Sequence, residues 1–243
     1  MTDAAPTDPN KIPVPAATVV LVRDAVDGQP GVEVLLARRN SKIYFAGGAW
    51  VFPGGRIDAE DHGDDYPGDL FDESDPMFLD VARRACVREA REEADAVISA
   101  DELVLLSHWV PPMEAPKRFS TFFFIGPAPT HDLTADGGEI HELAWMRPAD
   151  AVARRNADEI ELIPPTFVTL ALLDRFASAT EAIEHHRTAP PDYFVTKFAK
   201  DGDVMVSMWE GDAGYASGDA GIPGARHRIT MHPGAWTYER SAP

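Results

Sequence analysis

The feature that most restricts the fold is an amphipathic helical pattern at residues 76–94. An apolar stripe at helical spacing predicts this helix and comprises Phe78, Val81, Ala82, Ala85 and Cys86. Near its end, residues 88–93 read Arg-Glu-Ala-Arg-Glu-Glu, and the three carboxylates share one face because they are three and four residues apart. Such a face favours a hard divalent cation, although an acidic helix face alone is more often solvated surface.

A second constraint lies about thirty residues earlier, where Trp-Val-Phe-Pro-Gly-Gly spans residues 50–55. An apolar, strand-like segment runs into Pro-Gly-Gly, which predicts a sharp turn. Glycine leaves the backbone bare, so a phosphate or a metal ion could approach it closely.

Together the two segments resemble the Nudix box of the Nudix hydrolase family. In that family the pattern is a Gly, five residues, a Glu, seven residues, then Arg-Glu, an apolar residue, any residue, Glu-Glu, any residue, Gly and an apolar residue. Here the first Gly is Gly55, and the second half is matched by Arg88, Glu89, Ala90, Glu92, Glu93 and Ala96. The resemblance covers residues 16–175 and implies an α/β/α sandwich in which the box forms a loop, a helix and a loop.

The match departs from the family pattern in two places. An insertion at about residues 60–77 separates the halves, so counting forward from Gly55 puts Asp61 at the middle Glu, whereas counting back from Arg88 puts Asp80 there. Both alternatives are open at this point. At the helix end the family has Gly and this chain has Asp95, which enters the left-handed region only at some cost.

The charge balance restricts the partners. The 243 residues include 22 Lys plus Arg against 40 Asp plus Glu, a formal net charge of −18, which opposes nucleic acids and anionic membranes. A polyphosphate would also be repelled without a metal ion or a local basic patch. The one cysteine, Cys86, excludes an internal disulfide, suits a reducing cytoplasm and has apolar neighbours that predict burial. No apolar run approaches the roughly 18 residues of a membrane span.

The remaining patterns predict an α/β fold with a mixed sheet and helices on both faces. Strands are expected at residues 16–23, 32–39, 49–52, 103–110, 119–125 and 140–146, and the apolar segment 119–125 is expected to be central. Helices are expected at residues 76–94, 148–155 and 165–177, with a further helical stretch ending near His186. Residues 58–75 predict an acidic loop, and short strands are expected at 193–198, 204–209 and 227–231.

We therefore predict one Nudix-type domain at residues 13–175, with the insertion at about 60–77. A disordered tail at residues 1–12 precedes it, and residues 176–243 form a C-terminal extension packed on the same domain. A homodimer is expected from the resemblance alone.

Nudix hydrolases cleave a nucleoside diphosphate linked to another group by attack of water on a pyrophosphate phosphorus. The resemblance implies that Glu89 and Glu93 bind Mg²⁺ or Mn²⁺. Glu92 takes part through a further metal ion or a water molecule, and the carbonyl of Gly54 or Gly55 completes the site. We expect Arg88 to orient a glutamate through a charge-assisted hydrogen bond.

The catalytic base of many family members is a Glu outside the box. Glu139 and Glu142 both fit, and we choose Glu139 because it lies beside a Gly-rich turn. The alternative, which the sequence supports about equally, is that Glu139 and Glu142 are both ordinary carboxylates at a strand edge.

Upstream of the box, a second motif is similar in spacing to the coenzyme A signature of some Nudix enzymes. It comprises Leu35, Leu36, Arg39, Gly48 and residues 52–55. Ala37, Asn40 and Tyr44 replace its Thr, Ser and second Arg. We expect Arg39 to bind a substrate phosphate, with a surface ion pair as the alternative, and Lys117 and Arg118 to form a basic pair for polyphosphate.

The predicted substrate is therefore coenzyme A or an acyl-CoA. The alternative within the class is ADP-ribose or another nucleotide sugar. The alternative from another class is a Nudix-fold protein that binds a nucleotide without turning it over.

Overall fold

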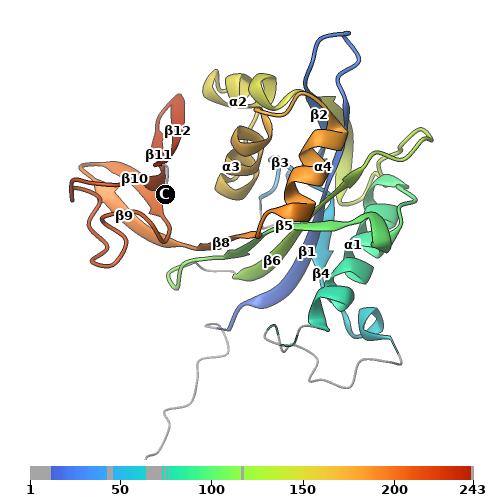
Figure 1. Ribbon diagram of the computed structural model, residues 1–243, viewed down its shortest axis with the longest axis horizontal. Helices are drawn as coiled ribbons and strands as arrows, with labels where there is room; N and C mark the ends of the chain where they lie inside the picture. Colours follow the sequence, from blue (N-terminus) through green and yellow to red (C-terminus); the bar gives the residue numbers. More distant parts are fainter. Residues whose placement is uncertain are drawn as a thin grey trace, which may run out of the picture.

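The computed structural model describes residues 12–42, 46–63, 73, 75, 77–115 and 118–241. Within them the main sheet has eight strands, in the order β3-β2-β1-β6-β5-β8 with β4 beside β1 and β7 beside β2 (Figure 1). Their bounds are β1 Val14–Asp24, β2 Val32–Arg39, β3 Trp50–Val51, β4 Gly54–Arg56, β5 Val104–Val110, β6 Phe119–Pro127, β7 Ile140–Met146 and β8 Asp192–Val195. The pairs β1–β6 and β5–β8 are parallel and the others antiparallel, so the sheet is mixed as predicted.

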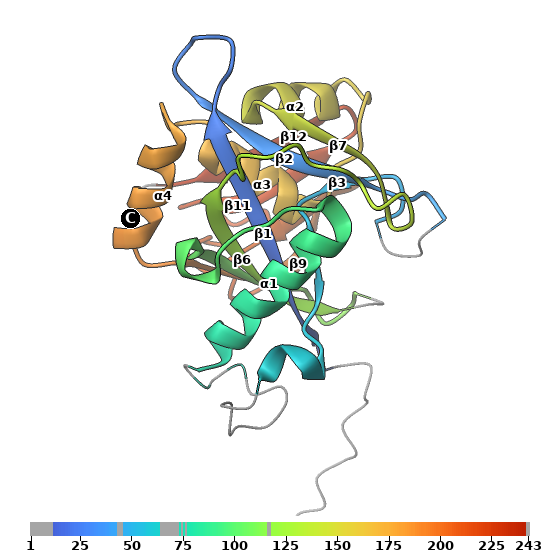
Figure 2. The same cartoon turned by 90° about the vertical axis from the view of Figure 1, so that its right-hand side faces the viewer.

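Helices cover both faces of this sheet, which confirms the predicted α/β class (Figures 1 and 2). One face carries α1 (Phe78–Ala94), and the other carries α2 (Pro148–Asn156), α3 (Pro164–Leu173) and α4 (Ala179–Thr188). Short 3₁₀ helices lie at Ala59–His62 and Ala100–Glu102. The apolar stripe of α1 is buried against Ala17, Val19 and Leu21 of β1, and Cys86 is a buried free thiol in this core. None of the described helices combines the length and apolarity that a bilayer crossing requires.

The apolar segment predicted to be central is β6. It lies between β1 and β5, and Phe124 and Ile125 are fully buried there. Alternate residues of β6 face α1 and the opposite helices, so this strand needs apolar side chains on both sides.

A second sheet follows, in the order β12-β11-β10-β9 and wholly antiparallel. Its strands are β9 Lys197–Asp201, β10 Val204–Met208, β11 His227–His232 and β12 Ala235–Arg240. The single strand predicted at residues 193–198 is wrong, because the chain leaves the main sheet after Val195 and enters the second sheet at Lys197. Between them, the N–H of Thr196 donates to the carbonyl of Val110 at 2.9 Å.

Aromatic side chains join the two sheets. Trp109 of β5 stacks on Phe194 of β8 with ring centroids 3.8 Å apart, and Trp209 meets Trp109 edge-on at 5.6 Å. His227 of β11 packs on Trp209 at 5.4 Å. At the outer edge of β8, the hydroxyl of Tyr215 donates to the carbonyl of Val195 at 2.9 Å.

Several element boundaries differ from the predictions. The helix expected at residues 165–177 ends at Leu173, and the two glycines of the turn expected at residues 53–55 belong to the short strand β4. Pro76, the expected start of α1, lies outside the described residues.

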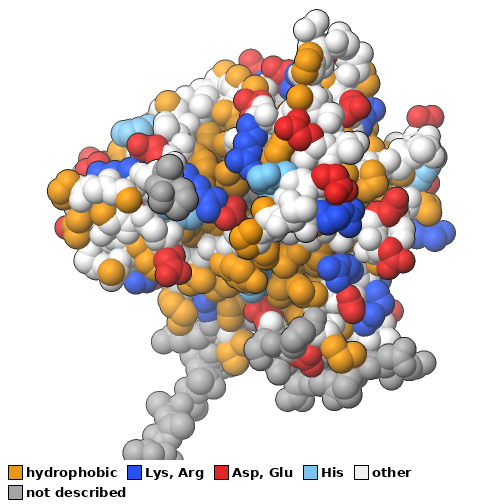
Figure 3. All heavy atoms as spheres, viewed as in Figure 1, with side chains coloured by type: hydrophobic (Ala, Val, Ile, Leu, Met, Phe, Trp, Pro, Cys, Tyr) orange, Lys and Arg blue, Asp and Glu red, His pale blue; other side chains and the backbone are white. Residues whose placement is uncertain are grey.

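On the face that Figure 3 shows, acidic and basic side chains are interspersed, so the negative charge is not gathered in one block there.

Candidate active site

Two glycines of β4 let a helix and a strand approach closely. Gly54 and Gly55 pair with Thr18 and Ala17 of β1. At Gly54, φ is 157° and a Cβ atom would lie 2.5 Å from the Cα of Thr18. At Gly55, a Cβ atom would lie 2.6 Å from the carboxyl carbon of Glu89 on α1. Ordinary contacts begin at 3.4 Å, so the backbone contacts of Gly54 require glycine, whereas a Cβ atom at Gly55 would displace the carboxylate of Glu89.

Glu93 lies against this strand with 5% of its surface exposed. Its Oε2 accepts a hydrogen bond from the N–H of Gly54 at 2.9 Å. Burial raises the pKa of Glu93 to about 8; the Gly54 bond and Arg39 oppose this rise, while the charges of Glu89 and Glu139 add to it. The site therefore holds more negative charge than its buried surroundings favour, and a cation would relieve it.

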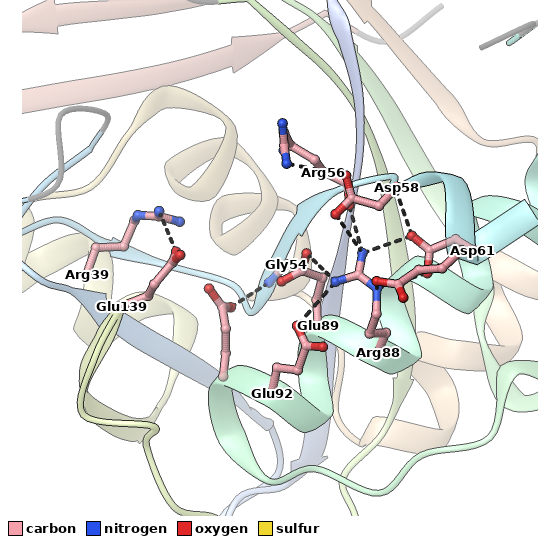
Figure 4. Close-up of polar contacts among 11 residues, drawn as sticks. Arg39, Gly54, Arg56, Asp58, Asp61, Arg88, Glu89, Glu92 and Glu139 are labelled. Atoms are coloured by element: carbon pink, nitrogen blue, oxygen red, sulfur yellow. Dashed lines mark hydrogen bonds and ion pairs between the residues drawn. The ribbon is translucent and has the colours of Figure 1, made fainter. Parts of the chain in front are cut away.

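Arg88 links the acidic side chains of the same helix (Figure 4). Its Nη1 donates to Glu89 at 2.9 Å and to Glu92 at 3.2 Å. Burial raises the pKa of Glu89, and the bond from Arg88 opposes that rise. The side chain of Glu89 is 14% exposed, whereas that of Glu92 is 59% exposed. Arg88 thus fixes the direction in which both carboxylates point.

The structure brings Asp61, and not Asp80, to this arginine. The Nε and Nη2 of Arg88 donate to the two carboxylate oxygens of Asp61 at 2.9 and 2.8 Å, a bidentate pair. The Asp61 side chain is 3% exposed and also accepts from the N–H of Asp58 at 2.8 Å. Asp80 is 66% exposed and pairs with Arg83 at 2.6 Å. Of the two alternatives, counting forward from Gly55 therefore gives the acid that contacts Arg88.

Arg39 and Glu139 meet on the other side of Gly54 (Figure 4). The Nη2 of Arg39 lies 3.3 Å from Oε2 of Glu139, and the two side chains are 17% and 65% exposed. Both charges act on Glu93, so they belong to the same site. Glu142, the other candidate base, pairs instead with the exposed Arg38 at 3.5 Å.

Asp136, which the sequence did not single out, holds the loop of Glu139. Its carboxylate accepts from the N–H groups of Gly138, Glu139 and Ile140 at 3.1, 2.9 and 2.8 Å. Partial burial opposes the effect, but these three bonds lower the pKa of Asp136. Its own N–H donates to the carbonyl of Glu93 at 3.2 Å. The Asp-Gly-Gly sequence at 136–138 was the available signal, because Asp side chains commonly bind N–H groups of the turn that follows them.

Of the predicted basic pair, the structure describes Arg118 alone. Lys117 lies outside the described residues. Arg118 is 7% exposed, and its Nε and Nη2 donate to the carbonyls of Pro112 and Pro111 at 3.1 and 3.2 Å. These contacts place the guanidinium in the loop between β5 and β6, so its predicted substrate contact gains no support.

Within the described part of the chain, no three His, Cys, Asp or Glu side chains are arranged to hold a metal ion as they stand. The reason is that Glu89 and Glu92 are held by Arg88, and Glu93 by the N–H of Gly54. The donor set nevertheless fits a hard divalent ion, since it consists of carboxylate and carbonyl oxygens in a site with excess negative charge. Metal binding would require these oxygens to exchange their present partners.

Comparison with known proteins gives consistent results. The family model for the NUDIX domain matches residues 13–166. A curated relative, "Putative nudix hydrolase 7" of Caenorhabditis elegans, is 26% identical over 166 residues, which are 58% of this chain and 56% of that protein. The chain thus spans a little over half the length of this relative. A solved NUDIX hydrolase structure from Alicyclobacillus acidocaldarius has a TM-score of 0.60 at 22% identity and covers 74% of this chain and 99% of its own, which shows a shared fold.

Proposed function

The chain belongs to the NUDIX domain family, and from this premise we propose that it hydrolyses the diphosphate of a nucleoside diphosphate derivative with the help of Mg²⁺ or Mn²⁺. The observation that carries the proposal is the packing of Glu89 and Glu93 onto the bare backbone of Gly54 and Gly55. When bound, the metal neutralises charge on phosphoryl oxygens and orients the attacking water.

The proposed metal ligands are Glu89, Glu92 and Glu93, with the carbonyl of Gly55. Burial raises the pKa of both Glu89 and Glu93, so their ionised forms lack sufficient compensation from the protein alone. Arg88 supports the set by holding two of these carboxylates from the same guanidinium nitrogen.

The proposed base and phosphate ligand are Glu139 and Arg39. Glu139 is well exposed and beside the acidic cluster, so its carboxylate can take a proton from a water molecule at that point. Arg39 brings a positive charge to the same place and can donate to a phosphate oxygen. The backbone bonds to Asp136 keep the base in position.

The substrate we propose is coenzyme A or an acyl-CoA, cut into a phosphopantetheine and adenosine 3′,5′-bisphosphate. The partial upstream motif supports this choice, and the position of Arg39 beside the acidic cluster supports a phosphate contact. ADP-ribose or another nucleotide sugar is the alternative within the class, because Ala37 and Asn40 replace two residues of that motif.

We also propose a reducing, cytoplasmic environment, with which the free buried Cys86 is compatible, and a homodimeric assembly expected from the family alone.

Replacing Glu93 by Gln should lower kcat/KM by at least about 10²-fold, the scale on which lost transition-state charge stabilisation acts. Glutamine keeps the shape and an acceptor for Gly54 but removes the negative charge. Steady-state rates with Mg²⁺ and Mn²⁺ measure the effect. Glu184→Gln is the control, because Glu184 is exposed on α4 and paired with Arg187. If the Glu93 variant kept full turnover, the assignment of Glu93 to the active site would be wrong.

The substrate is tested with a panel of coenzyme A, acyl-CoAs, ADP-ribose, NADH and dinucleoside polyphosphates, with products resolved by mass spectrometry. Release of adenosine 3′,5′-bisphosphate supports the coenzyme A proposal. Cleavage of ADP-ribose alone keeps the chemistry and discards that substrate. No cleavage in either metal would favour nucleotide binding without turnover.

A further inference from the structure

The turn at residues 58–63 carries Asp61 and directly follows β4. Its start is held by the backbone, because β4 pairs with β1 and the N–H of Ile57 donates to the carbonyl of Pro15 at 3.0 Å. Beyond that start, Asp61 and His62 are held to α1 by side-chain contacts.

Arg84 supplies two of these contacts. It lies one helical turn before Arg88, on the same side of α1. Its Nε donates to the carbonyl of Asp61 at 2.5 Å, and its Nη2 donates to the carbonyl of His62 at 2.6 Å. Both are short, charge-assisted bonds from one planar group, so they restrain orientation as well as distance.

The two arginines hold different parts of the same aspartate. Arg84 binds the main-chain carbonyl of Asp61, and Arg88 binds its carboxylate. Arg88 then reaches Glu89 and Glu92 through Nη1. A shift of the Asp61 backbone would therefore change the direction of the Arg88 guanidinium and, through it, of two proposed metal ligands.

We propose that Arg84 is a positioning residue for the metal site, which it orders through Asp61 and Arg88 without touching metal or substrate. This inference rests on the proposed function, because it assigns Glu89 and Glu92 to metal binding.

Arg83 is the matched control, because it is the neighbouring residue on the same helix and its contacts lead elsewhere. Its Nη1 donates to Asp80 at 2.6 Å, its Nε donates to the carbonyl of Leu103 at 3.4 Å, and its guanidinium lies over the ring of Phe124. Loss of Arg83 costs helix and sheet contacts of a similar kind but leaves the turn of Asp61 intact.

The experiment titrates the full-length protein with Mn²⁺ and measures free metal by electron paramagnetic resonance, without substrate. Arg84→Gln should weaken Mn²⁺ affinity about tenfold, the effect typical of residues that orient metal ligands. Arg84→Lys should recover part of it, since one ammonium can still reach a carbonyl. Arg83→Gln should bind Mn²⁺ as the unaltered protein does, and thermal unfolding checks that both Gln variants are folded.

The outcomes separate two failures. Mn²⁺ binding by the unaltered protein together with equal binding by Arg84→Gln would overturn the role of Arg84 alone. Equal weakening by Arg83→Gln would also overturn it, because the effect would then come from general helix stability. If the unaltered protein binds no Mn²⁺, the proposed function fails and the inference fails with it.

Discussion

At the scale of single residues, the site depends on an absent side chain. Gly55 leaves room for the carboxylate of Glu89, and a methyl group there would overlap it. The cost of a larger residue would therefore fall on a functional group, more than on the stability of the sheet.

Gly55→Ala should lower kcat/KM by at least about tenfold, because small misplacements of a catalytic group can cost up to 10²-fold. Kinetics together with thermal unfolding measure the two effects separately. Gly221→Ala is the control, since its φ is not positive and the nearest atom to an added Cβ is a side-chain oxygen of Asp219 at 3.2 Å. Unchanged kinetics in the Gly55 variant would show that Glu89 is not needed where it lies.

The motif in the sequence was enough to bring Gly55, Glu89 and Glu93 together as candidates, since their spacing is local to one turn and one helix. It could not choose between Asp61 and Asp80, because the length of an inserted segment says nothing about where its ends lie in space. Arg84 was missed for a different reason: its partners are main-chain carbonyls, which every residue has and which no sequence pattern identifies.

At the scale of elements, α1 ends in a strained conformation. Asp95 has φ 52° and ψ 29°, the left-handed region that the family fills with Gly, as the sequence led us to expect. The N–H of Asp95 still donates a hydrogen bond at the end of the helix, to the carbonyl of Arg91 at 3.0 Å. The carbonyl of Asp95 accepts a hydrogen bond from Nε2 of His131 at 2.8 Å. These bonds belong to the backbone, so glycine would keep them.

Asp95→Gly should raise the free energy of unfolding by roughly 0.5–1 kcal/mol, because removing Cβ relieves the left-handed strain by more than the added freedom of the unfolded chain costs. Urea denaturation at neutral pH measures the change. A less stable variant would mean that the aspartate side chain contributes more than its backbone strain costs.

The sequence patterns missed the elements whose secondary structure depends on contacts with segments far away in the chain. Gly-Gly-Arg has little intrinsic tendency to form a strand, and β4 exists because it pairs with β1. The strand expected at residues 193–198 is locally continuous in composition, but Thr196 lies where the chain changes sheets. The strands β2, β6 and β7 begin at the predicted residues, and the buried apolar side chains of β2 and β6 explain why their pattern was recognisable.

At the scale of the whole molecule, the two sheets share an aromatic junction that contains a histidine. His227 is 7% exposed, packs on Trp209 and donates through Nδ1 to the carbonyl of Glu210 at 2.7 Å. Burial lowers the pKa of His227, and the contact with Glu210 opposes that effect. Burial likewise lowers the pKa of His108 and of His186 to about 4.

A histidine with a lowered folded-state pKa binds protons more readily in the unfolded chain, so stability falls as the pH drops below the unfolded value of about 6.5. Between pH 7 and pH 5, His227→Gln should therefore lose less unfolding free energy than the unaltered protein. Urea denaturation at both pH values measures this. His232→Gln, exposed at the other end of β11, should behave like the unaltered protein. A variant at position 227 with an unchanged pH dependence would contradict the prediction.

The hydrogen bond from the hydroxyl of Tyr215 to the carbonyl of Val195 affects how copies of the protein can associate. An open sheet edge is a template on which another chain can add a strand, and β8 is such an edge. Tyr215 occupies one main-chain acceptor of this edge, the carbonyl of Val195. At the start of the same strand, the guanidinium of Arg240 donates two hydrogen bonds to the carboxylate of Asp192. A second copy of the protein therefore meets a blunted edge at β8, which disfavours a dimer that extends the main sheet from this strand.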